Sequence, residues 1–372
     1  SSARPWSDVS PGAKAVLRMS LYQMWRMDRI PDHALVHDAV ELAKRELGRG
    51  IDRYVNGVLR NLTRVRPWEK GDFPGQASDW VTVSLPEWLW VRWDERYGKE
   101  NARNFALSMN LPPRAVFRFA GTPEQSASGG FVRSDLVPSA YMFSDHHQAR
   151  HSRSIGKDAF HFQDEASQLI PFLLGPPAPG EIVWDACAAP GGKSAILWSI
   201  YRNEGSVVSS DLHPERAARL YRTLQRLGNA APAVVVADAC RPPPFLANFD
   251  AVLADVPCSG LGTIRRNPEI KWHFDPEHFA ALQQMQLQIL HSVSGAVRAG
   301  GRLLYSTCST EPEENEQVIS SFLSSHGDFR LEPPHYPPGI ENLISPDGMV
   351  RTFPDARLWD GFFAALLVRD LK

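Results

Sequence analysis

Apolar residues recur at helical spacing through the first part of the chain. They lie three or four positions apart at Leu17, Leu21, Met24, Val36, Val40 and Ala43. This spacing predicts two helices, because it gathers the apolar side chains on one helix face. Pro31-Asp32 marks the break between them, and a third helix is predicted through Tyr54–Leu62. The Pro- and Gly-rich stretch 66–78 predicts a linker, so residues 1–70 form a candidate helical domain.

The middle of the chain, residues 79–153, has a mixed pattern. Pro86 opens a helix that is rich in aromatic residues, and Pro112-Pro113 ends another. Residues Ala115–Phe119 form a candidate strand. No motif in this part carries chemistry, so we predict a structural role for it, with RNA contact as the alternative.

From residue 181 onward the pattern alternates between strands and helices. The candidate strands are Glu181–Ala186, Val207–Asp211, Ala233–Ala237, Asp250–Asp255, Gly301–Ser306 and Phe362–Val368. Helices are predicted between several of them, notably Pro214–Leu227 and Pro276–Val297. This alternation predicts an α/β domain over residues 154–372, with a parallel sheet covered by helices on both faces. Such sheets bind ligands at the carboxyl ends of their strands, so candidate site residues are sought there.

Composition changes this picture little. Hydrophobic residues at 43% and charged residues at 22% are ordinary values for a soluble globular protein. The net charge of −2 hides an uneven distribution, since residues 1–70 hold thirteen Lys and Arg against eight Asp and Glu. Solvated helix faces explain such a basic region as well as nucleic-acid binding does, so charge alone does not decide between them.

The sequence predicts neither a membrane span nor a metal site. It has no run of about eighteen apolar residues, and its first residues lack the apolar core of a signal peptide. The four cysteines have the spacing of neither a disulfide framework nor a zinc site. We therefore expect a reducing, cytoplasmic setting and no obligate protein partner.

A glycine-rich loop follows the first strand of the α/β region, at Asp185-Ala186-Cys187-Ala188-Ala189-Pro190-Gly191-Gly192-Lys193-Ser194. Glycines let the backbone approach a ligand closely, and the next helix offers unpaired N–H groups at its start. A nucleotide-phosphate loop is one alternative, but Cys187 stands where that loop requires its first Gly. A tight turn without a ligand is another alternative.

Three further strands are each followed closely by an aspartate, at Asp211, Asp238 and Asp255. A carboxylate after the second strand can accept hydrogen bonds from ribose hydroxyls, and one after the third can lie near an adenine. A single Asp at a strand end is more often a helix cap or a turn former. Together with Asp185, however, these residues end four strands in a row, which favours a ligand that contains a nucleoside.

Two cysteines lie at the ends of separate strands, Cys258 in Asp-Val-Pro-Cys and Cys308 in Ser-Thr-Cys-Ser. A buried structural role is the ordinary alternative for any Cys, and we assign it to Cys240. Thiols beside a carboxylate suit methylation of carbon 5 of cytosine, which is a poor nucleophile. Addition of a thiolate to carbon 6 makes carbon 5 reactive, and a base must later remove its proton. The residues alone leave either cysteine open as the nucleophile.

With these motifs, residues 160–372 resemble the NOL1/NOP2/Sun class of RNA 5-methylcytosine methyltransferases. The motifs are Gln163-Asp164-Glu165-Ala166-Ser167, the glycine-rich loop, Asp255–Gly260, Ser306-Thr307-Cys308-Ser309 with Glu311–Asn315, and Asp360-Gly361-Phe362-Phe363. Their order and spacing are specific to this class. The resemblance implies a Rossmann-like catalytic domain that uses S-adenosylmethionine.

The resemblance also implies roles for individual residues. The S-adenosylmethionine pocket would be lined by Cys187, Ala188, Ala189, Pro190, Gly191, Gly192 and Lys193. Asp211 would bind its ribose and Asp238 its adenine side, while Asp255 would border the pocket and recognise the cytosine. By the same resemblance Cys308 is the nucleophile, and Cys258 assists release of the product. DNA cytosine methyltransferases use a Pro-Cys cysteine instead, which would correspond to Cys258.

The front of the chain narrows the resemblance to a bacterial family that methylates small-subunit ribosomal RNA and carries a NusB-like domain. The similar segments are Ile30–Ala34, Ala39–Glu41, Val55–Arg60 and, in the catalytic region, Ile264–Trp272. This resemblance implies a cytosine in 16S rRNA as the target and a small α/β, RRM-like RNA-binding module at 79–153. The NusB-like region lacks the opening helices of that domain, so we expect a shortened form. Phe117-Arg118-Phe119-Ala120 also departs from the usual strand ending.

For RNA contact we predict Arg265, Arg266 and Lys271, which lie beside the Pro-Cys loop; a solvated surface loop is the alternative. Trp272 is a further candidate, as support for a flipped target base. Two other functions stay open. One is a tRNA cytosine methyltransferase with the same chemistry, which the NusB-like front disfavours. The other is a non-catalytic RNA-binding factor, which the two cysteines and Asp255 disfavour.

Overall fold

The computed structural model describes residues 5–27, 29–48, 50–68, 78–119, 130–143, 160–245, 248–353 and 357–371. The chain forms two compact units, Ser1–Ser78 and Asp79–Lys372. Most of the expected linker at 66–78, and the expected boundary between residues 153 and 154, lie outside the described residues.

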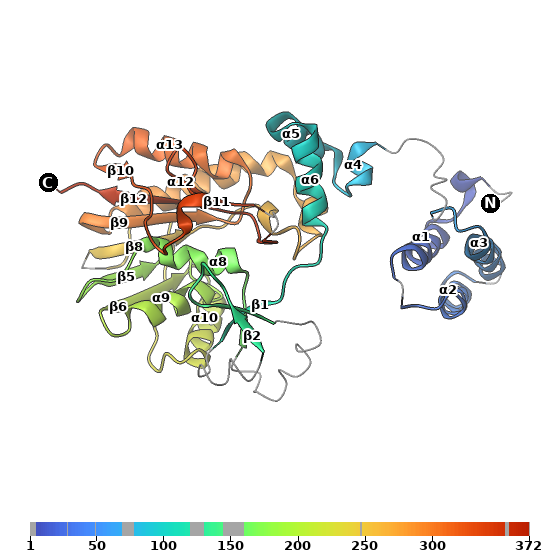
Figure 1. Ribbon diagram of the computed structural model, residues 1–372, viewed down its shortest axis with the longest axis horizontal. Helices are drawn as coiled ribbons and strands as arrows, with labels where there is room; N and C mark the ends of the chain where they lie inside the picture. Colours follow the sequence, from blue (N-terminus) through green and yellow to red (C-terminus); the bar gives the residue numbers. More distant parts are fainter. Residues whose placement is uncertain are drawn as a thin grey trace. The chain divides into compact units, whose positions relative to one another are not determined.

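The first unit is helical, as the spacing of its apolar residues predicts. After a short 3₁₀ turn at Trp6–Asp8 come α1 (Pro11–Arg26), α2 (Asp32–Leu47) and α3 (Ile51–Val65) (Figure 1). The Ser10 side chain accepts a hydrogen bond from the Ala13 N–H and so caps α1. The core of the unit consists of one apolar face from each helix, at Val16, Leu17, Val36, Ala39, Ala43, Val55 and Leu59.

The second unit begins with three helices, α4 (Asp79–Thr82), α5 (Glu87–Tyr97) and α6 (Lys99–Met109). Leu89, Trp93 and Ala106 from these helices share one core cluster with Leu261 and Phe279 from the later part of the chain. This packing places the carboxyl half of α5 against the loop that follows residue 308, where Trp93 donates a hydrogen bond to Glu311.

A small antiparallel sheet follows. Its strands are β1 (Val116–Phe119), β2 (Phe131–Arg133), β3 (Ala140–Phe143) and β4 (Phe160–Phe162), in the order β2-β3-β1-β4. Aromatic residues dominate the strands, and Phe117 packs against Phe131, Phe143 and Phe160. Because β4 pairs with β1, the sheet extends beyond residue 153, where we expected the module to end.

The large sheet has eight strands, in the order β10-β12-β9-β8-β5-β6-β7 with β11 beside β12. The strands are β5 (Ile182–Asp185), β6 (Ser206–Asp211), β7 (Ala233–Val236), β8 (Phe249–Asp255), β9 (Val297–Thr307), β10 (Phe329–Leu331), β11 (Val350–Thr352) and β12 (Phe362–Arg369). The first five are parallel, as predicted. The last is not, because β12 pairs antiparallel with β9, so the sheet is mixed.

The direction of β12 has a physical reason. After β9 the chain returns along α13 (Glu316–Ser325) to β10, and residues 332–361 then bring it back to the carboxyl ends of the parallel strands. A strand that starts at this edge must run antiparallel to its neighbour. Asp360, just before β12, therefore lies at the edge where parallel sheets bind ligands.

Helices cover both faces of the large sheet (Figure 1). On one face α9 (Gly192–Tyr201) packs on Val183, Leu253 and Leu304; on the other, α12 (Phe279–Ser294) and α13 pack on the alternate strand residues. α10 (Pro214–Arg226) lies against β7 and α9. Both faces are apolar because a parallel sheet is buried on both sides.

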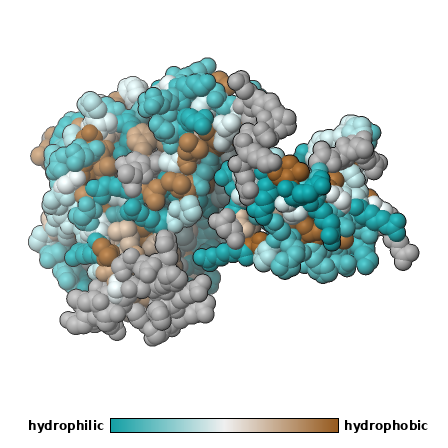
Figure 2. Space-filling view, turned by 45° about the vertical axis from the view of Figure 1, so that its right-hand side comes forward, coloured by the Kyte–Doolittle hydropathy of each residue, from teal (hydrophilic) through white to brown (hydrophobic). Residues whose placement is uncertain are grey.

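Short helices connect these elements. They are α8 (Glu165–Leu169), Ile170–Leu174, Leu261–Thr263, α11 (Ile270–His273), Pro276–His278, Pro312–Glu314 and Ile340–Leu343. None of the described helices is both long and apolar enough to cross a membrane. Polar residues predominate on the face shown in Figure 2, with apolar residues scattered among them.

Candidate active site

The carboxyl ends of β5, β8 and β9 bring the candidate residues together. Asp185 ends β5 and Asp255 ends β8, and the two strands are paired in parallel. β9 ends at Thr307, directly before Cys308, and pairs with β8 on its other side. Because parallel strands end at the same edge of a sheet, the motifs that follow these three strands lie side by side at that edge.

The two cysteines are neighbours. The Sγ atoms of Cys258 and Cys308 lie 3.3 Å apart, and both cysteines are free thiols. Close backbone packing beneath them requires a glycine at position 262, which donates to the Cys308 carbonyl. A Cβ atom there would lie 1.9 Å from the Gly361 carbonyl oxygen and 2.8 Å from that of Cys308.

The surroundings of Cys258 keep its thiol protonated. Its pKa is raised well above the usual value, first by the hydrogen bond to Cys308, then by burial and by the charges of Cys308 and Glu314. A thiol of this kind is a poor source of thiolate at neutral pH, but it can donate its proton to a stronger base beside it.

Asp255 is held beside the cysteines by two hydrogen bonds. Lys193 Nζ and Ser306 Oγ each donate to it, both at 2.7 Å. Burial alone would lower the pKa of Lys193, but the charge and hydrogen bond of Asp255 outweigh burial, and the pKa lies above its usual value. The lysine is therefore a cation, and it fixes the orientation of the Asp255 carboxyl group.

Glu314 joins the two cysteine loops, a role that the sequence analysis missed. Its buried carboxylate accepts from Ser259 N at 2.8 Å, from Ser259 Oγ and Ser309 Oγ at 2.5 Å each, and from Gln286 Nε2 at 3.0 Å. Ser259 follows Cys258 and Ser309 follows Cys308, so one carboxylate sets the distance between the thiols. The motif Glu311–Asn315 marks this segment, but it does not distinguish Glu314 from Glu311 or Glu313.

A pocket of about 370 Å³ opens beside Asp255. Its lining residues are His161, Phe162, Gln163, Ser167, Asp185, Cys187, Ala188, Ala189, Pro190, Gly192, Lys193, Arg219, Thr223, Arg226 and Asp255. Seven residues of the glycine-rich loop, which runs from Asp185 to Ser194, are among them. Gly191 itself has φ +110°, a conformation that favours glycine, and a Cβ at Gly192 would lie 2.9 Å from Gln163 Oε1.

The pocket fits a ligand that carries positive charge. Asp185 is fully buried, and its Oδ2 accepts from Ser194 Oγ at 2.5 Å, while Oδ1 has no hydrogen-bond partner. Burial raises the pKa of Asp185 to about 7. Gln163 Oε1 is likewise without a partner. A cationic nucleoside such as S-adenosylmethionine, with its ammonium and sulfonium groups, would satisfy these acceptors and neutralise the carboxylate.

Asp211 and Asp238 lie farther along the same edge and do not line this pocket. Asp211 accepts from the His213 N–H and pairs with Arg216 at 3.2 Å. Asp238 accepts from the Cys240 N–H and pairs with Arg241 at 3.2 Å. Both therefore stabilise turns in the structure, and their contacts with ribose and adenine stay predictions.

The cations that we predicted as RNA contacts are engaged within the protein. Arg265 is 6% exposed and donates to the Ser108 carbonyl, and Lys271 is 3% exposed and donates to Asn110. Neither offers its charge to a phosphate at the surface, so the geometry corrects our expectation for these two. Their loop packs against α6, a contact between distant segments that the local sequence does not reveal.

Arg266 links two carboxylates. It donates to Asp164 at 2.5 Å and to Asp360 at 2.8 Å, and both partners are buried. Burial, with the charge of Asp164, raises the pKa of Asp360 to about 7 against the opposing effect of Arg266. Arg266 thus ties the segments before α8 and β12 to the Pro-Cys loop, and its predicted phosphate contact is replaced by this ion-pair network.

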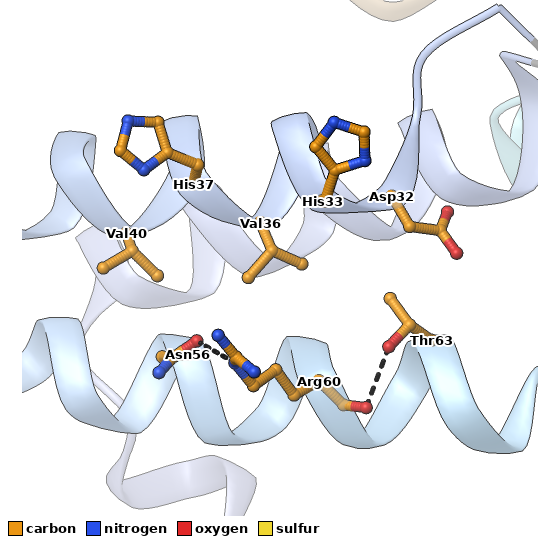
Figure 3. A pocket seen from close by; sticks show the side chains of 8 residues that line it. All are labelled: Asp32, His33, Val36, His37, Val40, Asn56, Arg60 and Thr63. Carbon is orange, nitrogen blue, oxygen red and sulfur yellow. Dashed lines mark hydrogen bonds between the residues drawn. The ribbon is translucent and has the colours of Figure 1, made fainter.

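A larger hollow of about 690 Å³ lies in the first unit, between α2 and α3 (Figure 3). Val36 and Val40 of α2 point toward α3, where Arg60 donates to Asn56 at 3.0 Å. None of the predicted site residues lines it. Among the described residues of both units, no group of three or more His, Cys, Asp or Glu side chains could hold a metal ion.

Comparison with known proteins identifies the family of this chain. The family model described as 16S rRNA methyltransferase RsmB/F matches residues 172–368, and the NusB family model matches residues 1–64. A probable ribosomal RNA small subunit methyltransferase B from Bacillus subtilis is 36% identical over 95% of this chain and 82% of its own length. The ribosomal RNA small subunit methyltransferase B of Klebsiella pneumoniae is 32% identical over 99% of this chain and 84% of its own.

Solved structures have the same fold. A methyltransferase homologue from Pyrococcus horikoshii is 27% identical and superposes with a TM-score of 0.65, covering 78% of this chain and 97% of its own. NSun6 from Pyrococcus horikoshii, solved with SFG, is 20% identical and also has a TM-score of 0.65, over 77% and 98% of the two chains. From the matching family model and these relatives, the chain belongs to the 16S rRNA methyltransferase RsmB/F family.

Proposed function

We propose that this protein transfers a methyl group from S-adenosylmethionine to carbon 5 of a cytosine in 16S rRNA, with Cys308 as a covalent nucleophile. Membership in the family supports methylation of ribosomal RNA with S-adenosylmethionine. The observation that carries the finer proposal is the pair of thiols 3.3 Å apart, next to the Asp255 carboxyl group at the rim of the pocket.

The first step is addition of the Cys308 thiolate to carbon 6. The Sγ–C6 bond forms, and the electron pair of the C5–C6 double bond becomes available at carbon 5. S-adenosylmethionine would supply the electrophilic methyl group: as the bond from carbon 5 to the methyl forms, the methyl–sulfur bond breaks and S-adenosylhomocysteine leaves. Asp255 contributes by accepting a hydrogen bond from the exocyclic amino group, and Lys193 and Ser306 hold it in place for this.

The second step restores the aromatic ring. A base removes the proton from carbon 5, the electron pair re-forms the C5–C6 double bond, and the Sγ–C6 bond breaks to release Cys308. Cys258 lies within proton-transfer distance of the Cys308 sulfur. Its raised pKa favours the thiol, which suits proton transfer during release rather than nucleophilic attack. We therefore assign release to Cys258, and the family resemblance of the Thr-Cys-Ser motif supports Cys308 as the nucleophile.

The cofactor residues follow from the pocket. The glycine-rich loop from Cys187 to Lys193 would surround S-adenosylmethionine, and Asp185 would neutralise part of its positive charge. Asp211 would bind the ribose and Asp238 the adenine side, with their present turn contacts retained or exchanged on binding. These roles are expectations that substitution of each carboxylate would test by S-adenosylmethionine affinity.

The test is methyl transfer from labelled S-adenosylmethionine to unmodified 16S rRNA and, separately, to unmodified tRNA. We expect label only in rRNA, and we expect digestion to nucleosides to yield 5-methylcytosine. Label confined to tRNA would support the proposed methylation reaction but refute 16S rRNA as the substrate. Binding of S-adenosylmethionine without transfer to either RNA would instead support a non-catalytic RNA-binding factor.

A further inference from the structure

Many arginines of the second unit lie in ion pairs with carboxylates. They are Arg92, Arg96, Arg216, Arg241, Arg266, Arg298, Arg302, Arg330, Arg351, Arg357 and Arg369. Several others, including Arg118, Arg202, Arg219 and Arg226, pair with no carboxylate that the structure describes, and Arg118, Arg202 and Arg226 differ from the rest in their common location. We call these three the arginine seam, since they lie where the small sheet meets α9 and α10.

The three residues come from three elements, and two of them, Arg118 and Arg226, lie beside His161. Arg118 in β1 lies directly across from His161 in β4. Arg226, the last residue of α10, donates to His161 Nδ1 at 3.3 Å. Arg202 caps the carboxyl end of α9, lies over the Trp198 ring, and is near enough for its charge to act on Arg118.

No carboxylate among the described residues pairs with the positive charge of the seam. Burial, and then the charge of Arg202, lower the pKa of Arg118 to about 10. Burial, and then the charges of Arg226 and Arg118, lower the pKa of His161 to about 4. Arg118 remains a cation at neutral pH, and its buried Nη1 has no hydrogen-bond partner. Such a group is costly unless a ligand completes its hydrogen bonds.

An anion would remove both the repulsion and the unmet hydrogen bonds. Guanidinium groups match the oxygens of phosphate with paired N–H donors, which makes phosphate the anion that this arrangement fits best. Arg226 also lines the pocket that contains Asp255, so the seam and the reaction site share one hollow. His161 lines the same pocket, so an RNA strand whose target base reaches Asp255 can place its backbone on the seam while S-adenosylmethionine occupies the glycine-rich loop.

We infer that Arg118, Arg202 and Arg226 bind a backbone phosphate of the RNA substrate. This inference rests on the proposed function, because it takes RNA as the partner. It assigns phosphate contact to three cations that pair with no carboxylate the structure describes, in place of Arg265 and Lys271, which are buried and donate hydrogen bonds within the protein.

The test measures how RNA affinity depends on salt. Arg202→Gln is the chosen variant, because Arg202 does not line the pocket of Asp185. Arg330→Gln is the matched control, because Arg330 is exposed on β10, at the opposite edge of the large sheet. Both changes are made in a Cys308→Ala background, so that no covalent adduct forms. The probe is a fragment of unmodified 16S rRNA, titrated at several chloride concentrations.

We expect Arg202→Gln to reduce the slope of log affinity against log salt by about 0.7 to 0.9, the share of one phosphate. Affinity at 0.1 M salt should fall about fivefold to tenfold, and Arg202→Lys should retain the slope because it keeps the charge. Arg330→Gln should match the parent protein. Affinity for S-adenosylmethionine should not change in Arg202→Gln.

Three results would overturn the inference. The first is an unchanged slope in Arg202→Gln and also in Arg226→Gln. The second is weaker binding of S-adenosylmethionine by Arg202→Gln, which would assign the seam to the carboxylate of the cofactor. The third is binding of inorganic phosphate at the seam in a protein whose RNA binding is unchanged by Arg202→Gln. This result would indicate a site for free phosphate. A parent protein that transfers no methyl group, together with the expected fall in salt slope for Arg202→Gln, would refute the proposed function. The inference that the seam binds an RNA phosphate would then still hold.

Discussion

Charged groups in the active-site loops and in the arginine seam have different surroundings. In the loops, Asp255 accepts from Lys193 and Ser306, and Glu314 accepts four hydrogen bonds. In the seam, Arg118 has a buried N–H group without a partner. Charges that are satisfied within the protein fix its geometry, whereas charges without partners are available to a ligand. The comparison separates residues that position the reaction from residues that hold the substrate.

The largest effect is expected at Glu314. Its replacement by Gln puts an amide N–H₂ group where one carboxylate oxygen now accepts from two serine hydroxyls. We expect kcat to fall by about 100-fold, because displaced thiols lose their alignment. The free energy of unfolding should fall by about 3 kcal/mol. Glu313→Gln is the control, since Glu313 is partly exposed and contacts neither serine; an equal loss in that variant would contradict a specific role for Glu314.

Arg266 should behave as a structural cation. Its replacement by Met leaves Asp164 and Asp360 without their shared partner, so we expect the free energy of unfolding to fall by about 3 kcal/mol. At a temperature where the variant is folded, the salt dependence of RNA binding should remain that of the parent. If Arg266→Met instead lowers the salt dependence of RNA binding without loss of stability, Arg266 contacts RNA. It would then not belong with the charges that are satisfied within the protein.

The pH dependence of cofactor binding should follow the ionisation of the Asp185 carboxyl group. Its pKa of about 7 means that the ionised form, which attracts a cation, grows as the pH rises. Affinity for S-adenosylmethionine should therefore increase about eightfold between pH 6 and pH 7.5, measured by calorimetry. Asp185→Asn should bind weakly and lose this dependence. A wild-type affinity that stays constant over this range would contradict the assignment.

The raised pKa of Asp185 also makes the free energy of unfolding depend on pH. Because the folded pKa of Asp185 is raised, its contribution to stability is full below the unfolded value of 3.8. That contribution is lost as the pH rises to about 7. The protein without S-adenosylmethionine should thus lose stability over this window, and Asp185→Asn should lose less. Chemical denaturation at several pH values measures the difference.

The smallest effect is expected at Lys271. Burial lowers the pKa of this lysine, and its Nζ has a long hydrogen bond of 3.2 Å to Asn110. Replacement by Met keeps the packing of the side chain, so the free energy of unfolding should change by less than about 1 kcal/mol. RNA affinity should be unchanged at all salt concentrations. A fall in affinity like that of Arg202→Gln would restore Lys271 as a phosphate contact.

The sequence predicted the parts of the fold that depend on local pattern. The helices of the first unit and the parallel strands from β5 to β9 follow from the spacing of apolar residues. The direction of β12 and the pairing of β4 with β1 did not follow, because they depend on where long connections return. Periodicity carries no information about strand direction.

For the site, the sequence predicted which loops meet but not how charge is distributed among them. Cys258, Cys308 and Asp255 stand at strand ends, which the topology alone brings together. Glu314 could not be singled out among three neighbouring glutamates, because only packing decides which of them faces Ser259 and Ser309. The same reason hid the arginine seam, whose members come from β1, α9 and α10.

The most direct test of the central claim is trapping of the covalent protein–RNA intermediate. Wild type, Cys258→Ala and Cys308→Ala are incubated with S-adenosylmethionine and unmodified 16S rRNA, and adducts are resolved on a denaturing gel. We predict that the covalent protein–RNA adduct accumulates in Cys258→Ala and is absent from Cys308→Ala. An adduct that survives in Cys308→Ala and disappears in Cys258→Ala would reverse the roles of the two cysteines and contradict the account.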